Sequence, residues 1–162
     1  MATPDSAARA TSITRRELPS SVVEGWADGV LTVFVPGVPT NMKNKVGHWS
    51  KRHRWAKQWR ARTVSRVSQW RVTHGPIGPW PWSPYDPKRI LFTIYGPSRF
   101  DDDNRALVAS PCRDALQDAL IIDSDGNPEH LFLYAQAPPT RTTGRVHGIA
   151  IRVELAKTQE VN

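Results

Sequence analysis

Six mostly apolar residues, Ile90-Leu91-Phe92-Thr93-Ile94-Tyr95, form the run that most constrains the fold, and Gly96-Pro97 ends it. The run is too short for an ordinary helix and is rich in β-branched and aromatic residues, so it predicts a β-strand. Because apolar and polar residues do not alternate along it, both faces of this strand are expected to be buried. A sheet around this strand is therefore the centre of the expected fold.

Helices and further strands are expected on either side of this run. Val30–Val35 predicts a strand that stops at a Pro-Gly turn, and residues 131–135 and 146–155 predict two more. Helices are expected from about Ser50 to His74 and from about Pro111 to Leu120. The order β-α-β-α-β-β predicts a single α/β (α+β) domain with a mixed sheet.

Each expected helix has its own sequence signature. In the second, Asn104 or Ser110 is the expected N-cap, with Pro111 at the first helical position. In the first, five residues share one sector of about 120° and are expected to make core or dimer contacts: Trp55, Ala56, Trp59, Val67 and Trp70.

The length of 162 residues fits one domain with tails. Residues 1–25 are expected to be a flexible N-terminal tail, 26–156 the folded domain and 157–162 a C-terminal tail. Residues 75–88 form a Pro/Trp-rich loop within the domain. Its Trp80 and Trp82 are expected to pack on the sheet, with insertion into an opened DNA junction as the alternative.

Charge and cysteine content restrict the classes of binding partner and the cellular compartment that are expected for this chain. The net charge is +7, and Lys43–Arg71 holds ten Lys/Arg with no Asp or Glu, which favours nucleic acid as a partner. No apolar run approaches the ~18 residues of a membrane span, so no membrane partner is expected. The single Cys112 cannot form an internal disulfide and is expected to be a small buried residue. A cytoplasmic location follows as the expectation.

Two groups of aspartates suggest a metal site. Asp101 and Asp103 follow the strand at 90–95, and in an extended segment they would face the same way. Asp123 and Asp125 follow the second helix and are expected to fold back beside the first group. Oxygen ligands of this kind suit Mg²⁺ or Mn²⁺, which together with a basic surface suggests phosphodiester hydrolysis. The alternative is a solvated Asp-rich turn.

The motifs together resemble the RusA family of Holliday-junction resolvases, which are commonly encoded by phages and prophages. Asp101-Asp102-Asp103-Asn104 is similar to the family's D-x-D-N motif, and Asp114-Ala115-Leu116, followed by Asp125, is similar to its D-A-L motif and spaced aspartate. The segment Val35–Asn41 is similar to its opening strand and Pro/Asn loop. The resemblance covers roughly Leu31 to Leu155.

The resemblance implies a homodimeric, Mg²⁺-dependent endodeoxyribonuclease that resolves four-way junctions in recombination and repair, in the bacterial host cytoplasm if phage encoded. It implies that Asp101, Asp103 and Asp125 bind the metal and catalyse cleavage, with Asp123 beside them. The residues expected to contact branched DNA are Asn41, Lys43, Lys45, Lys51, Arg52, Arg54, Asn104, Arg105 and Arg113.

The chain departs from the family pattern in two places: a lysine of the family is absent, and Ser124-Asp125 stands where the family usually has Asp-Asp. The family has a lysine between the D-x-D-N and D-A-L motifs, whereas no lysine lies between Asp101 and Asp125 here. Arg105 or Arg113 would have to contact the phosphate instead, although a planar guanidinium is not equivalent to an ammonium group. Two alternatives therefore stay open: a catalytically impaired RusA-like DNA-binding protein, and a nuclease for other branched DNA.

Overall fold

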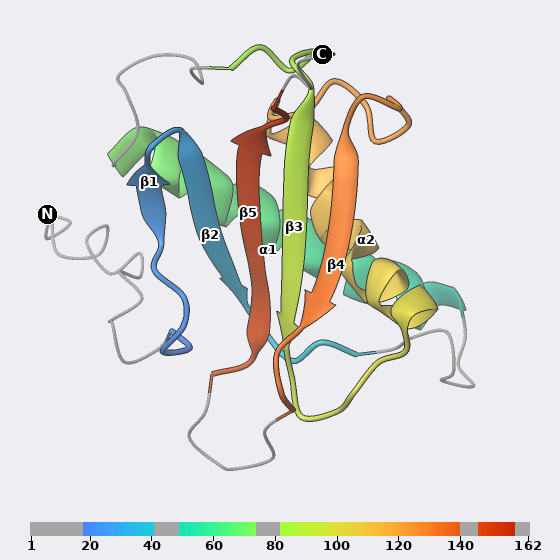
Figure 1. The fold of residues 1–162 in the computed structure, drawn as a ribbon. Coiled ribbons are helices and arrows are strands. Elements are labelled where there is room, and N and C mark those ends of the chain that lie inside the picture. The colour runs from blue at the N-terminus through green and yellow to red at the C-terminus, as the bar shows by residue number, and fades with distance from the viewer. Residues whose placement is uncertain (1–17, 41–48, 74–81, 140–145, 158–162) are drawn as a thin grey trace, which may run out of the picture.

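The computed structural model describes residues 18–40, 49–73, 82–139 and 146–157. Two helices and a five-stranded mixed sheet make up this part of the chain (Figure 1). In chain order the elements are β1 (Gly25–Ala27), β2 (Val30–Pro36), α1 (Trp49–Thr73), β3 (Lys88–Tyr95), α2 (Asp102–Asp118), β4 (Leu131–Gln136) and β5 (Gly148–Leu155). The expected order is confirmed, with the short β1 added before it.

The sheet has the strand order β1-β2-β5-β3-β4, so the last strand of the chain lies in its middle. β5 pairs antiparallel with both β2 and β3, whereas β3 and β4 are parallel. Helix α2 makes the crossover between β3 and β4, as a parallel pair requires. Both helices lie behind the sheet in Figure 1, so the domain has two layers.

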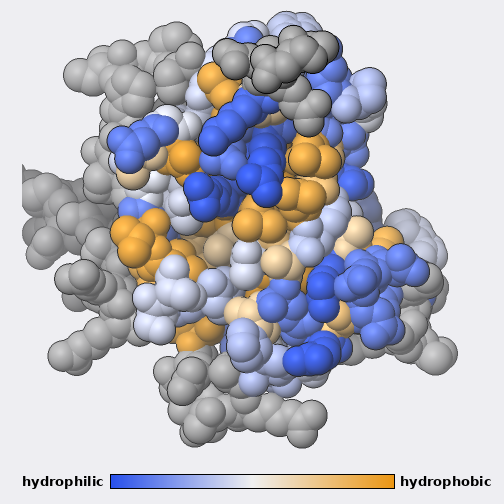
Figure 2. Space-filling model, viewed as in Figure 1, coloured by the Kyte–Doolittle hydropathy of each residue, from blue (hydrophilic) through white to orange (hydrophobic). Residues whose placement is uncertain are grey.

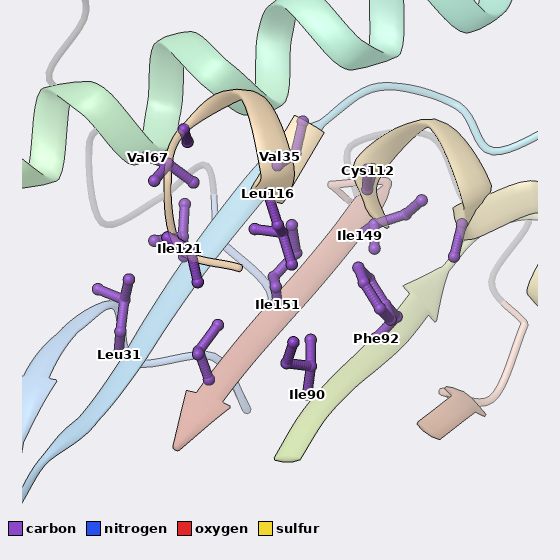
Figure 3. Packing of buried hydrophobic residues seen from close by; sticks show 14 of the residues in the cluster. Leu31, Val35, Val67, Ile90, Phe92, Cys112, Leu116, Ile121, Ile149 and Ile151 are labelled. Carbon is purple, nitrogen blue, oxygen red and sulfur yellow. The ribbon is translucent and has the colours of Figure 1, made fainter. Parts of the chain in front are cut away.

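The core lies between the helices and the sheet (Figure 3). Ile90, Phe92 and Ile94 of β3 point toward the helices and are fully buried. Leu91 and Thr93 on the opposite face are only half-buried. The expectation that both faces of this strand are buried is therefore wrong, because both helices cover the same face of the sheet.

Helix α1 packs through the side that its sequence predicts. Trp59 and Val67 are buried, and Trp55 is partly buried against the same core. Thr63 joins them because its hydroxyl donates to the Trp59 carbonyl at 2.8 Å, which satisfies its polar atom in the interior. The side chain of Trp70 lies outside the described residues. Neither described helix has an apolar stretch long enough to cross a membrane.

The Pro/Trp-rich loop is described from Trp82 onward. The Trp82 side chain is buried, and its ring centroid lies 4.8 Å from that of Trp26 in β1. Packing against the domain, the first interpretation, is confirmed for Trp82, while Trp80 lies outside the described residues.

Residues 18–25, expected to belong to a flexible tail, are part of the folded domain. Val22 packs on the sheet face away from the helices, against Phe34. Glu24 accepts from the Phe34 backbone N–H at 2.7 Å and forms an ion pair with Arg66 of α1, also at 2.7 Å. β1 has only three residues and does not reach Phe34 of β2. The Glu24 carboxylate therefore satisfies the Phe34 N–H in place of a neighbouring strand. Residues 1–17 lie outside the described residues.

Helix α2 begins earlier than expected. Asp101 is its N-cap, and Pro111 lies inside the helix rather than at its first position. A proline removes the N–H that would bond to the carbonyl four residues earlier, here that of Leu107. The Ser110 hydroxyl donates to this carbonyl at 2.9 Å, which replaces the missing bond. The expected start at Pro111, with Ser110 or Asn104 as cap, is therefore wrong.

Candidate functional site

The first acidic group forms the N-terminus of α2. Asp101 has an extended backbone at the N-cap, and its carbonyl accepts from the N–H groups of Asn104 and Arg105, both at 3.0 Å. Asp102 and Asp103 lie in the first helical turn, where negative charge interacts favourably with the helix dipole. The expectation of an extended segment with Asp101 and Asp103 on one face is wrong, because the helix starts between them.

All three of these aspartates are exposed. The Asp101 carboxylate makes no capping hydrogen bond to the backbone N–H groups of the helix end. Arg105 forms an ion pair with Asp102 at 2.9 Å and donates to the Phe100 carbonyl at 3.1 Å. Arg105, a candidate replacement for the family's lysine, is thus held beside the acidic turn by two partners.

The second acidic group lies at the opposite end of α2 (Figure 1). The helix has 17 residues, which at ~1.5 Å per residue is about 25 Å. Asp123 and Asp125 follow its C-terminus, so they do not fold back beside Asp101 and Asp103 as expected. In the described ranges, no three His, Cys, Asp or Glu side chains are close enough to hold one metal ion. One copy of the chain therefore does not bring the expected carboxylates together.

The charge of Asp125 acts instead on Asp114, an aspartate that was part of the D-A-L motif but not of the expected site. Burial, and next to it the charge of Asp125, raises the pKa of Asp114. Arg113 lies beside them, with its Nε 3.5 Å from Asp125 Oδ2. The Arg113 Nη1 donates to the Tyr134 hydroxyl of β4 at 3.1 Å, which orients the guanidinium. The sequence signal for this pair was the spacing of the two motif aspartates.

Asp123 has a structural role in the loop after α2. His130 Nε2 lies 2.7 Å from its Oδ1, and the Asn127 side chain donates to the same carboxylate at 3.2 Å. The hydrogen bond to His130 is the largest cause of the lowered pKa of Asp123. The His130 side chain is fully buried. Asp123 therefore fixes the loop that carries Asp125.

A buried lysine near this loop was missed by sequence reasoning. Lys88, the first residue of β3, is fully buried, and its Nζ donates to the carbonyls of Ser83 at 2.7 Å and Asp86 at 3.0 Å. Burial lowers its pKa, while the charges of Asp86 and Asp123 oppose that shift. Its contacts tie the turn before β3 to the sheet.

The basic residues of α1 form an exposed face. Lys51, Arg52 and Arg54 are exposed, as expected for phosphate contacts, while Trp59 on the other side of the helix is buried. This separation of charged and apolar sides leaves the cations accessible to a polyanion. Asn41, Lys43 and Lys45 lie outside the described residues, and Asn104 is half-buried in the first turn of α2.

Replacing Asp114 by asparagine is expected to stabilise the protein at neutral pH by about 0.5 kcal/mol, a small effect because the site stays partly open to solvent. A carboxyl group with a raised folded-state pKa destabilises the fold once pH rises through that pKa, and this cost is absent below its ordinary pKa. The gain in Tm should therefore disappear near pH 3.

Asp118→Asn, four residues further along α2, is the matched control with the opposite sign. A hydrogen bond from Arg60 is the largest cause of the lowered pKa of Asp118, so this variant should lose Tm at neutral pH. Thermal unfolding at the two pH values measures both effects, and a fall in Tm for Asp114→Asn at pH 7 would contradict the expectation.

Comparison with known proteins assigns no family. No family model matches the chain, and a search of curated proteins finds no match. The resemblance to RusA-family resolvases stays a prediction from the motif residues, above all Asp101 to Asn104, Asp114 and Asp125.

Proposed function

We propose that this chain is a divalent-metal-dependent endodeoxyribonuclease that cuts branched DNA, with the four-way junction as its substrate. The observation that carries the proposal is the electrostatic effect of Asp125 on half-buried Asp114, because both aspartates belong to the motif pattern and lie in separate segments, α2 and the loop after it. Unneutralised carboxylates placed close together repel, so such a pair is favoured where a cation or a shared proton offsets the repulsion.

The donor chemistry fits Mg²⁺, with Mn²⁺ as a substitute. Carboxylate oxygens are the ligands that both cations prefer, and exposed Asp101 and Asp103 are accessible to a phosphate-bound ion. When bound, the metal supplies charge neutralisation at the phosphate and a more acidic water. Arg113 lies beside Asp125 and partly offsets its charge, and the exposed cations of α1 would contact phosphates on either side of the cut.

A second candidate function is DNA binding without cleavage. The observation that favours it is the engagement of both arginines that would replace the family's lysine. Arg105 pairs with Asp102, and Arg113 lies beside Asp125 and bonds to Tyr134. A phosphate contact requires a guanidinium with free N–H donors that points away from the acidic groups. Both of these guanidinium groups are instead engaged by neighbouring protein groups.

The test is cleavage of an end-labelled four-way junction, with a flap and a linear duplex of matched sequence as controls. Each substrate is incubated with Mg²⁺, Mn²⁺ or a chelator, and the products are resolved on a denaturing gel. Paired nicks in the junction that disappear with chelator would support the nuclease. A junction that shifts on a native gel but stays uncut with both metals would instead support the binding protein, and cutting of the flap alone would change the substrate.

A further inference from the structure

We infer that the first turns of α1 hold a stacking site for an unpaired DNA base, formed by Trp49 and His53 and flanked by exposed cations. This inference rests on the proposed function for the identity of the substrate, branched DNA, but the site itself is argued from α1. It gives the protein a means to distinguish a branch point, where bases are open, from an uninterrupted duplex.

The first step is that α1 extends beyond the core at its N-terminal end. Its first buried residue is Trp59, which at ~1.5 Å per residue lies about 15 Å along the helix from Trp49. Trp49 and buried Val67 are about five turns apart at ~3.6 residues per turn, so they share one side of the helix, yet Trp49 is 70% exposed. In Figure 1 this end of α1 lies past the β4 edge of the sheet. The apolar side of α1 therefore continues beyond the core to an aromatic ring at the surface.

The second step is the orientation of the exposed indole. Trp49 and His53 are one helical turn apart, and their ring centroids lie 6.2 Å from each other with the ring planes at 60°, an edge-to-face arrangement. This contact restricts the rotation of the Trp49 side chain before a ligand binds, which lowers the entropic cost of binding. An indole held in this way offers a π-face on which any of the four bases can stack.

Charge complementarity identifies nucleic acid as the occupant. The exposed cations in the first turns of α1 are Lys51, Arg52, Arg54 and Lys57. The N-terminal end of a helix carries a partial positive charge, and no acidic residue in the first turn of α1 offsets it. A strand whose base stacks on Trp49 thus meets cations for its phosphates on the same turns. Figure 2 shows hydrophilic side chains gathered on the side of the molecule where α1 begins in Figure 1.

The indole distinguishes bases by their state rather than by their sequence. In a duplex each base is paired and already stacked on its neighbours, so stacking on the protein requires that the base first leave the helix. An unpaired base at a branch point has an open π-face and needs little of that energy. The site therefore favours branched over linear DNA without reading base identity.

Tyr85 is a matched exposed ring that lacks the surrounding positive charge. It lies in the turn before β3 and is 72% exposed. Its neighbour Asp86 accepts from the Ser83 N–H at 2.8 Å, so a carboxylate is fixed in the same turn. A phosphate is repelled by that charge. Tyr85 is therefore the control for an aromatic ring that is exposed but belongs to no stacking site.

The site is tested by binding in chelator, so that no cleavage intervenes. The probes are a fluorescent oligothymidylate, a strand of the same length made of abasic linkers, and a duplex. Trp49→Ala should weaken binding of oligothymidylate about tenfold and leave binding of the abasic strand and the duplex within about twofold of the wild type. Trp49→Phe should recover most of the loss, and Tyr85→Ala should bind all three probes as the wild type does.

The salt dependence of binding separates stacking from charge. Stacking releases no counterions, so Trp49→Ala should keep the wild-type slope of log affinity against log salt. Lys51→Ala should lower the affinity for all three probes and reduce that slope for a single strand by about 0.7, the value of one phosphate contact. Circular dichroism checks that each variant keeps the fold.

Equal losses on oligothymidylate and on the abasic strand would show that Trp49 acts without a base and would overturn the inference. A lower sedimented mass for Trp49→Ala would mean that a second copy of the chain covers this side of α1, with the same consequence. If the wild type cuts junctions but Trp49→Ala binds every probe normally, the proposed function stands and the stacking site fails. If Trp49→Ala loses only the oligothymidylate but no branched substrate is cut, the stacking site stands and the nuclease fails.

Discussion

Replacing Asp103 by asparagine is expected to slow junction cutting about a thousandfold while leaving junction affinity within about twofold of the wild type. A correctly held cation stabilises the transition state by several kcal/mol, and about 4 kcal/mol corresponds to a thousandfold change in rate. Asp103 is exposed in the first turn of α2, so its loss leaves the core intact. Binding depends instead on the cations, which the substitution does not touch.

Single-turnover cleavage with saturating protein measures the rate, and a native gel in chelator measures affinity. Asp102→Asn is the matched control, because Asp102 lies in the same turn, is 92% exposed at its side chain and pairs with Arg105. It should cut within about threefold of the wild type, since a surface ion pair contributes little. Full cutting by Asp103→Asn, or equal losses in both variants, would remove Asp103 from the catalytic group.

The strands and α1 could be predicted closely because their signals are local. The segment expected as a strand at 30–35 is β2 at Val30–Pro36, and the helix expected at about 50–74 is α1 at Trp49–Thr73. In both, the pattern of apolar residues decides which side faces the core. β1 was not expected, because three residues are too few to show any periodicity.

The start of α2 was not predictable from its own proline. Pro111 normally marks a helix start, and the bond from the Ser110 hydroxyl to the Leu107 carbonyl is what allows the helix to pass through it. This local error changed the expected site, because it left Asp101 and Asp103 in an extended segment. A helix that starts at Asp102 also carries the chain further from the first acidic group before Asp123 is reached.

The composition of the candidate site was predicted better than its geometry. The sequence pattern singled out Asp114 and Asp125, which interact electrostatically in the fold, yet it could not show which carboxylates lie near one another. Asp123 was expected to help bind metal, but its hydrogen bonds to His130 and Asn127 occupy it within the loop. These hydrogen-bond partners depend on the path of the loop from α2 to β4. No local sequence motif determines that path.

Trp59→Ala is expected to destabilise the domain by about 4 kcal/mol, a large part of the roughly 5–15 kcal/mol that folded domains typically have. Trp59 is 2% exposed and is the largest fully buried side chain among the described residues. Its ring fills the space between α1 and the turn after β2, where a Cβ added at Gly37 would lie 3.1 Å from it.

Trp49→Ala tests whether burial, rather than the loss of any indole from α1, causes this effect. Trp49 is on the same helix but 70% exposed, so its replacement should cost less than about 0.5 kcal/mol. Urea unfolding followed by far-ultraviolet circular dichroism measures both variants independently of tryptophan fluorescence. An unchanged m value would show that the midpoint shift reports stability. A buried indole of this size cannot be removed without leaving a cavity. A cost below about 1 kcal/mol for Trp59→Ala, or equal costs at both positions, would therefore mean that α1 does not pack on the core through Trp59.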